Sequence, residues 1–264
     1  MNKSLVWIAL ALAGASAQQA QKEVRVEQYT IRKGPIPADS EPLTAGMIGA
    51  DGRMGLLNVA GKPFSATEKR HTVQMLANGA KIENSDSDQF YRDDQGRIRI
   101  EQTLDGKTIT VIMDPVARFV AILDRTTRTV HKNTFPAEAV NGSVSLTKGR
   151  VRVFMGNKSG DPDEKHLTSE SLGDREISGV MATGTRKVRV IPAGAIGNDR
   201  DLQVVSESWF SADLGVLVKS VNSDPRFGDT SFQLTNIVRG MQDPSLFQIP
   251  PDYTVTDRPP LGGK

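Results

Sequence analysis

The chain has 264 residues, with 33 basic and 31 acidic side chains, 5% aromatic residues and no cysteine. The lack of cysteine excludes disulfides, thiol catalysis and a lipidated N-terminal cysteine. The near balance of charge gives no reason to expect nucleic acid or an anionic membrane surface as a partner.

The first 17 residues, MNKSLVWIALALAGASA, have the pattern of a secretory signal peptide. Lys3 precedes an apolar run from Leu5 to Ala13, and Ala15-Ser16-Ala17 fits the small-residue cleavage pattern. The run is shorter than the roughly 20 apolar residues that a membrane span needs. We therefore expect cleavage after Ala17, a periplasmic or secreted location, and no membrane span in the mature chain.

Removing 17 of the 264 residues leaves 247, enough for one large β domain or two small ones. Residues 18–61 are polar or rich in glycine and proline, and GPIPADSEP (34–42) cannot hold a regular helix or a central strand. The sequence predicts an N-terminal arm over 18–61, ahead of a main domain over 62–255.

A first series of strands is predicted from Phe64 to Asn133. Short alternating segments are separated by turn signals, of which Asn78-Gly79 best fits a tight hairpin. The gaps are too short for the crossover helices of a parallel sheet, so we expect an antiparallel meander. The predicted strands span 64–76, 81–92, 97–104, 108–114, 117–124 and 128–133.

A second meander is predicted after a less regular stretch. A short helix over 136–140 and a mobile loop over 156–164 precede it. Its strands are expected at 167–174, 175–192, 202–211, 215–223 and 230–240. One short turn and an extended segment would close the domain over 243–255, and 256–264 would form a disordered tail.

No catalytic, cofactor-binding or metal-binding residues are predicted. His71, His131 and His166 show no metal-ligand spacing, and GNKSG (156–160) does not match the nucleophile motif G-x-S-x-G. The acidic stretch SDSD (85–88) lacks the pattern of a calcium loop.

Three segments, at 61–102, 112–132 and 191–255, occur in an order that resembles a group of secreted, uncharacterised bacterial proteins common in Acidobacteria. More distantly, the pattern E-x-W-x-S…G…V-K followed by LF-x-I-P-x-x-Y is similar to the LolA/LolB and RseB-like half-barrel superfamily. The matching positions here are Glu207, Trp209, Ser211, Gly215, Val218, Lys219, Leu246, Phe247, Ile249, Pro250 and Tyr253.

The resemblance implies a mainly β fold, a single curved antiparallel sheet (a LolA-like half-barrel) with few short helices, and no catalytic residues. It implies a non-enzymatic protein whose concave face binds a hydrophobic ligand, either a lipid or a lipoprotein acyl chain. An RseB-like envelope sensor that contacts a regulatory membrane protein is the alternative, and a secreted hydrolase is a third reading. The superfamily closes its sheet with helices, and this sequence offers few amphipathic segments for them.

Trp209 is the candidate ligand-binding residue. Alternation along a strand over 202–211 sends Trp209 and Phe210 to opposite faces of the sheet, so they cannot both line one pocket. Trp209 is the preferred candidate because its ring offers a large apolar area and an N–H donor.

Overall fold

The computed structural model describes residues 30–33, 53–55, 59–104, 106–134, 143–147, 150–155 and 166–257. The expected signal peptide (1–17), most of the expected arm (18–61), the helix at 136–140 and the loop at 156–164 lie outside the described residues. So does the expected tail from residue 258 onward, whereas its first two residues, 256 and 257, belong to a strand and are not disordered.

The described chain is built from strands joined mostly by tight turns. Its elements are β1 (Thr30–Lys33), β2 (Arg53–Gly55), β3 (Phe64–Met75), β4 (Lys81–Arg92), β5 (Ile98–Leu104), β6 (Lys107–Asp114), β7 (Phe119–Asp124), β8 (Thr129–Thr134), β9 (Ser143–Thr147), β10 (Arg150–Met155), β11 (Leu167–Ile177), β12 (Val180–Ile191), β13 (Leu202–Ser211), β14 (Val216–Asp224), β15 (Gly228–Arg239), the short 3-10 helix η3 (Pro244–Phe247) and β16 (Thr254–Asp257).

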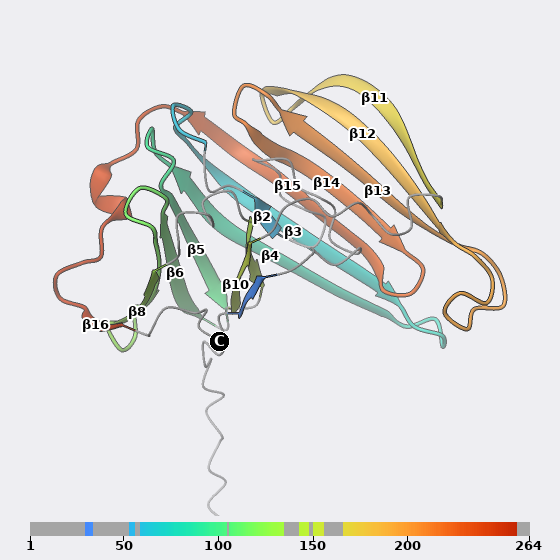
Figure 1. Cartoon of the computed structure of the whole chain (residues 1–264), viewed down its shortest axis with the longest axis horizontal. Coiled ribbons are helices and arrows are strands. Elements are labelled where there is room, and N and C mark those ends of the chain that lie inside the picture. Colours follow the sequence, from blue (N-terminus) through green and yellow to red (C-terminus); the bar gives the residue numbers. More distant parts are fainter. Residues whose placement is uncertain are drawn as a thin grey trace, which may run out of the picture.

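Twelve of the strands form one open, curved sheet (Figure 1). Its order is β11-β12-β13-β14-β15-β3-β4-β5-β6-β7-β8-β16. The pairing of β15 with β3 joins the two predicted meanders into this one sheet. Over the residues that the structure describes, the mainly β fold with a curved sheet and almost no helix is therefore confirmed.

Two details differ from a single antiparallel sheet. The edge strand β16 runs parallel to β8, because the chain reaches this edge through the long closing segment and not through a hairpin. In addition, β1, β10, β9 and β2 form a separate four-stranded sheet, and two of its strands lie within the segment expected to be an arm. Figure 1 labels β2 and β10 of this smaller sheet.

The prediction placed one hairpin turn wrongly. The expected boundary between residues 174 and 175 lies inside β11, where Gly173 (φ 73°) sits at a register shift in the pairing with β12. The turn is formed instead by Ser178 (φ 52°) and Gly179 (φ 81°), both left-handed, as a two-residue hairpin turn requires. The sequence signal was misread because Gly173-Asp174 is as typical of a turn as Ser178-Gly179.

Three hairpins share a turn in which an aspartate side chain accepts hydrogen bonds from backbone N–H groups of the turn itself. Oδ1 of Asp114 accepts from the N–H groups of Val116 and Ala117, at 2.9 and 2.7 Å. Asp124 and Asp224 begin turns with the same kind of bond. Four residues after each aspartate the backbone is left-handed, at Arg118 (φ 58°), Arg128 (φ 52°) and Gly228 (φ 90°). These aspartates therefore set the turns of the sheet.

Replacing Arg118 by glycine is expected to stabilise the protein by about 0.5–1 kcal/mol. A left-handed backbone costs a residue with a side chain about 1–2 kcal/mol, and glycine removes this cost. Part of the gain is lost again, because glycine loses more conformational entropy when the chain folds. The measurement is the urea midpoint. Arg125→Gly, at an exposed turn position without positive φ, is the control and should destabilise slightly. Equal destabilisation by both changes would contradict the expectation.

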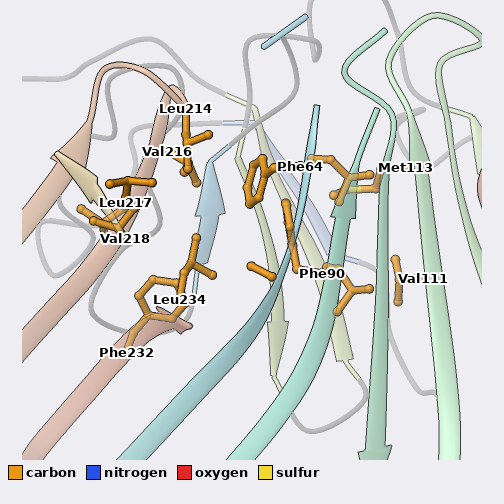
Figure 2. Close-up of a cluster of buried hydrophobic side chains, with 14 of the residues drawn as sticks. Phe64, Phe90, Val111, Met113, Leu214, Val216, Leu217, Val218, Phe232 and Leu234 are labelled. Carbon is orange, nitrogen blue, oxygen red and sulfur yellow. The ribbon is translucent and has the colours of Figure 1, made fainter. Parts of the chain in front are cut away.

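The main sheet carries an apolar layer on one face, defined by side chains that share that face through direct cross-strand pairing. One row runs from Ala66 through Phe90, Ile100 and Val111 to Ile122, each pairing with the next. Side chains paired in this way pack against one another. We use the name apolar layer for twelve of the buried side chains, each at most 5% exposed: Phe64, Ala66, Phe90, Ile98, Ile100, Ile109, Val111, Met113, Val120, Ile122, Phe232 and Leu234. Figure 2 labels Phe64, Phe90, Val111, Met113, Phe232 and Leu234 among them, together with Leu214, Val216, Leu217 and Val218 of the same buried cluster.

The opposite face carries a smaller cluster that the closing segment covers. Ile112, Leu123 and Val130 are buried there and pack against Ile249 and Tyr253. The guanidinium of Arg97 lies 5.3 Å from the ring centre of Phe247, the buried residue of η3. The pattern LF-x-I-P-x-x-Y thus describes a segment that covers this side of the sheet.

Among the described residues, the structure contains no helix that is both long enough and apolar enough to cross a membrane.

Candidate functional site

The apolar layer ends at a polar row. The row consists of Glu68 on β3, Asp88 on β4 and Gln102 on β5. Each lies on the same face as the apolar layer, two residues from Ala66, Phe90 and Ile100 in the direction of the β3–β4 turn. Glu68 pairs directly with Asp88 on one side and with Leu234 on the other. The same face also buries Arg92, which pairs with Phe64 and Ile98 at the other end of the apolar layer. Glu68 and Asp88 are two buried acids side by side in this largely apolar face, and they mark the row as the candidate site.

Arg70 links the acids of this row, and we call Glu68, Arg70, Asp88 and Gln102 the acid cluster. Nη1 of Arg70 lies 3.1 Å from Oε1 of Glu68, and Nη2 of Arg70 donates to Oδ2 of Asp88. Nε2 of Gln102 also donates to Oδ2 of Asp88, at 3.0 Å. Asp88 therefore accepts two hydrogen bonds, while Glu68 has an ion pair alone.

Glu68 is a buried acid whose hydrogen-bonding capacity is unused. Its side chain is 2% exposed, and neither carboxyl oxygen has a hydrogen-bond partner. Burial raises the pKa of Glu68 from its ordinary 4.5 to about 7; Arg70 opposes this rise and Asp88 adds to it. Glu68 thus changes charge near neutral pH, inside the sheet's buried face.

Burial also raises the pKa of Asp88, against the lowering effect of Arg70 and of the hydrogen bond from Gln102. Beyond the acid cluster the same face opens to solvent, since Thr72, Asn84 and Asp86 are exposed. The acid cluster therefore lies where the buried apolar layer meets water.

Trp209, the residue singled out from the sequence, lies on the opposite side of the sheet from the acid cluster. It pairs with Lys219, whereas the neighbouring Ser208 pairs with Ser220, and Ser220 pairs with Phe232 of the apolar layer. The ring is 3% exposed.

Two contacts hold the Trp209 ring. A Cβ atom added at Gly184, its cross-strand partner, would lie 2.6 Å from the ring, so glycine makes room for it. The guanidinium of Arg175 lies 4.8 Å from the ring centre on the outer side. Phe210 is half-buried and packs against the buried hydrophobic cluster that includes Trp209 and the apolar layer. A ligand contact by Trp209 stays a prediction.

Other residues of the motif also have local structural partners. Oε1 of Glu207 accepts from Nε and Nη2 of Arg186, at 2.9 and 2.6 Å. Gly215 has φ 63° and a Cβ there would lie 2.9 Å from Cγ1 of Val59. The pattern E-x-W-x-S…G…V-K thus consists of residues that pack or pair within the sheet, which explains why it indicates a fold and not a catalytic activity.

The structure does not bring the three histidines together. His71 contacts Ser85 and Glu83, His131 contacts Thr256, and His166 is exposed. Within the described ranges, no group of three histidine, aspartate or glutamate side chains is placed to hold a metal ion.

Sequence reasoning missed the acid cluster. A signal was present in the sequence. Strand alternation places Phe64, Ala66, Glu68 and Arg70 on one face, so two charged residues follow two apolar ones on the same face. That Asp88 lies beside Glu68 follows only from the register of the β3–β4 hairpin.

No protein-family model and no curated protein matches the chain. Among solved structures, the chain is similar to one from the Pseudomonas aeruginosa MucA/MucB complex, with 14% identity and a TM-score of 0.42. That match covers 74% of this chain but only 58% of the other, so this chain spans little more than half of it.

Two further solved structures also match the chain. An uncharacterised conserved protein from Thermus thermophilus matches with 11% identity and a TM-score of 0.42, over 75% of this chain and 91% of that one. A LolA superfamily protein from Nitrosomonas europaea matches with 8% identity and a TM-score of 0.31, over 73% and 92%.

Proposed function

We propose that this protein is a non-enzymatic, periplasmic or secreted binding protein that takes a lipid or a lipoprotein acyl chain on the apolar layer. The observation that carries the proposal is the layer itself, twelve apolar side chains on one face of a curved sheet, bordered by a polar row. A ligand site of this class needs such a surface and a few polar groups at its rim.

Burial of an acyl chain supplies the binding energy in this proposal. Each methylene group transferred from water contributes about 0.8 kcal/mol. The side chains of the layer are at most 5% exposed, so a ligand reaches them only in a conformation that exposes the layer. Part of the binding energy offsets the free-energy cost of that conformation. Chains of sufficient length should therefore bind, and short ones should not.

Titration with saturated fatty acids of 8 to 16 carbons, by displacement of a fluorescent fatty-acid analogue, tests the proposal. We expect the affinity to rise about threefold to fourfold for each added methylene group up to a limiting length. Native mass spectrometry of the purified protein should show a bound lipid.

A protein that carries no lipid and does not bind the fluorescent analogue would contradict the proposal. The RseB-like reading, a module that contacts an envelope regulatory protein, would then become the working hypothesis.

A further inference from the structure

We propose that Glu68 and Asp88 bind the head group of this ligand, and that the head group carries a primary ammonium. The inference rests on the proposed function, because it names the chemistry at one end of the same site. It concerns the acid cluster, which the packing of the sheet by itself does not require.

The first argument is the hydrogen-bonding balance of the acid cluster. Arg70 shares its guanidinium between the two carboxyl groups, and Gln102 donates a hydrogen bond to Asp88. Neither oxygen of Glu68 receives a hydrogen bond, although the side chain is 2% exposed. Leaving a buried polar group without a partner costs about 1–3 kcal/mol, so a ligand group that donates there recovers this energy.

The second argument is charge. Two carboxylates and one guanidinium leave a net negative charge in the buried row when both acids are ionised. An ammonium group compensates this charge and brings three donors, whereas a carboxylate or phosphate head group would add repulsion. A metal ion is a poorer candidate, because the described residues hold no group of three ligands.

The third argument is position. Ala66, Phe90 and Leu234 lie next to the acid cluster on the buried side, and Thr72 and Asn84 are exposed on the other. From Glu68 back to Phe64 the layer continues for roughly 13 Å along β3. A ligand with an apolar chain and a cationic end would match this gradient, with its head group at the solvent border.

Binding of an ammonium group should also depend on pH. The group requires an ionised Glu68, whose pKa burial raises to about 7, so the affinity should fall as the pH drops below 7. The charged groups that face Glu68 are Arg70 on its own strand and Asp88 on β4, with Asp86 acting on Asp88. From β15 it faces the apolar Leu234.

The test is displacement of the fluorescent fatty-acid analogue by dodecylamine, dodecanoate and dodecanol, each below its micellar concentration, at pH 6 and pH 8. We expect dodecylamine to bind at least tenfold more tightly than dodecanoate at pH 8, and this preference to shrink about tenfold at pH 6. In Glu68→Gln the preference should fall below twofold. Glu170→Gln, an exposed site on β11, should keep it.

The outcomes separate the two proposals. If dodecanoate or dodecanol binds as tightly as dodecylamine, the head-group inference is wrong and the acyl-chain proposal stands. If none of the three compounds binds, and the analogue does not bind either, both are wrong. Loss of all three compounds in Glu68→Gln would also contradict the inference, since the residue would then be needed for the site as a whole.

Discussion

Trp209→Ala is expected to lower the free energy of unfolding by about 3–5 kcal/mol, measured by urea denaturation. The ring is 3% exposed, lies against Gly184 and receives the guanidinium of Arg175 at 4.8 Å. Its removal leaves a cavity that β12 and β13 cannot close, because their register is fixed over nine residue pairs. The loss should therefore include both the transfer energy of the ring and the energy of the cavity.

Phe227→Ala is the control, since this aromatic residue is 69% exposed at the β14–β15 turn and should change stability by less than about 1 kcal/mol. The hypothesis from the sequence, in which Trp209 lines the ligand site, expects loss of ligand binding with little loss of stability. That result would contradict the structural role given to Trp209 here.

Glu68→Gln is expected to stabilise the protein at pH 8 by up to about 3 kcal/mol and to have little effect at pH 4. Burial raises the pKa of Glu68 to about 7 in the folded protein, against an ordinary value of 4.5. Between these values the folded state holds a proton that the unfolded state has released, so the free energy of unfolding of the native protein falls as the pH rises from 4.5 to 7. Glutamine has no such proton and removes this slope.

The measurement is a series of urea unfolding curves from pH 4 to pH 8 for both proteins. Glu170→Gln is the matched control, because the same chemical change at an exposed site should leave the two pH profiles parallel. If Glu68→Gln destabilises the protein equally at every pH, the carboxyl group is held as an ion by its partners, and the account of the acid cluster fails.

Much of the fold could be predicted from local patterns. β4 and β13 begin and end at the predicted residues, 81–92 and 202–211, since turn residues bound their alternating stretches. The parallel pairing of β16 with β8 could not be predicted, because no local signal connects segments about 125 residues apart. The joining of the meanders through β15 and β3 is non-local for the same reason.

The candidate site was less predictable than the fold. Trp209 attracted attention because tryptophan is rare in the chain, and its burial depends on Gly184, a partner on another strand. The acid cluster depends on the register between β3, β4 and β5, which brings Glu68, Asp88 and Gln102 onto one face. A shift of one residue in β4 would have turned Asp88 to the other side.

Methyl NMR on isoleucine-labelled protein tests the central proposal most directly. With saturating dodecanoate or dodecylamine, we expect the signals of Ile100 and Ile122, in the apolar layer, to shift. The signal of Ile112, on the opposite face under the closing segment, should stay in place and serves as an internal reference. Unchanged signals for Ile100 and Ile122, or a shift confined to Ile112, would contradict binding on the apolar layer.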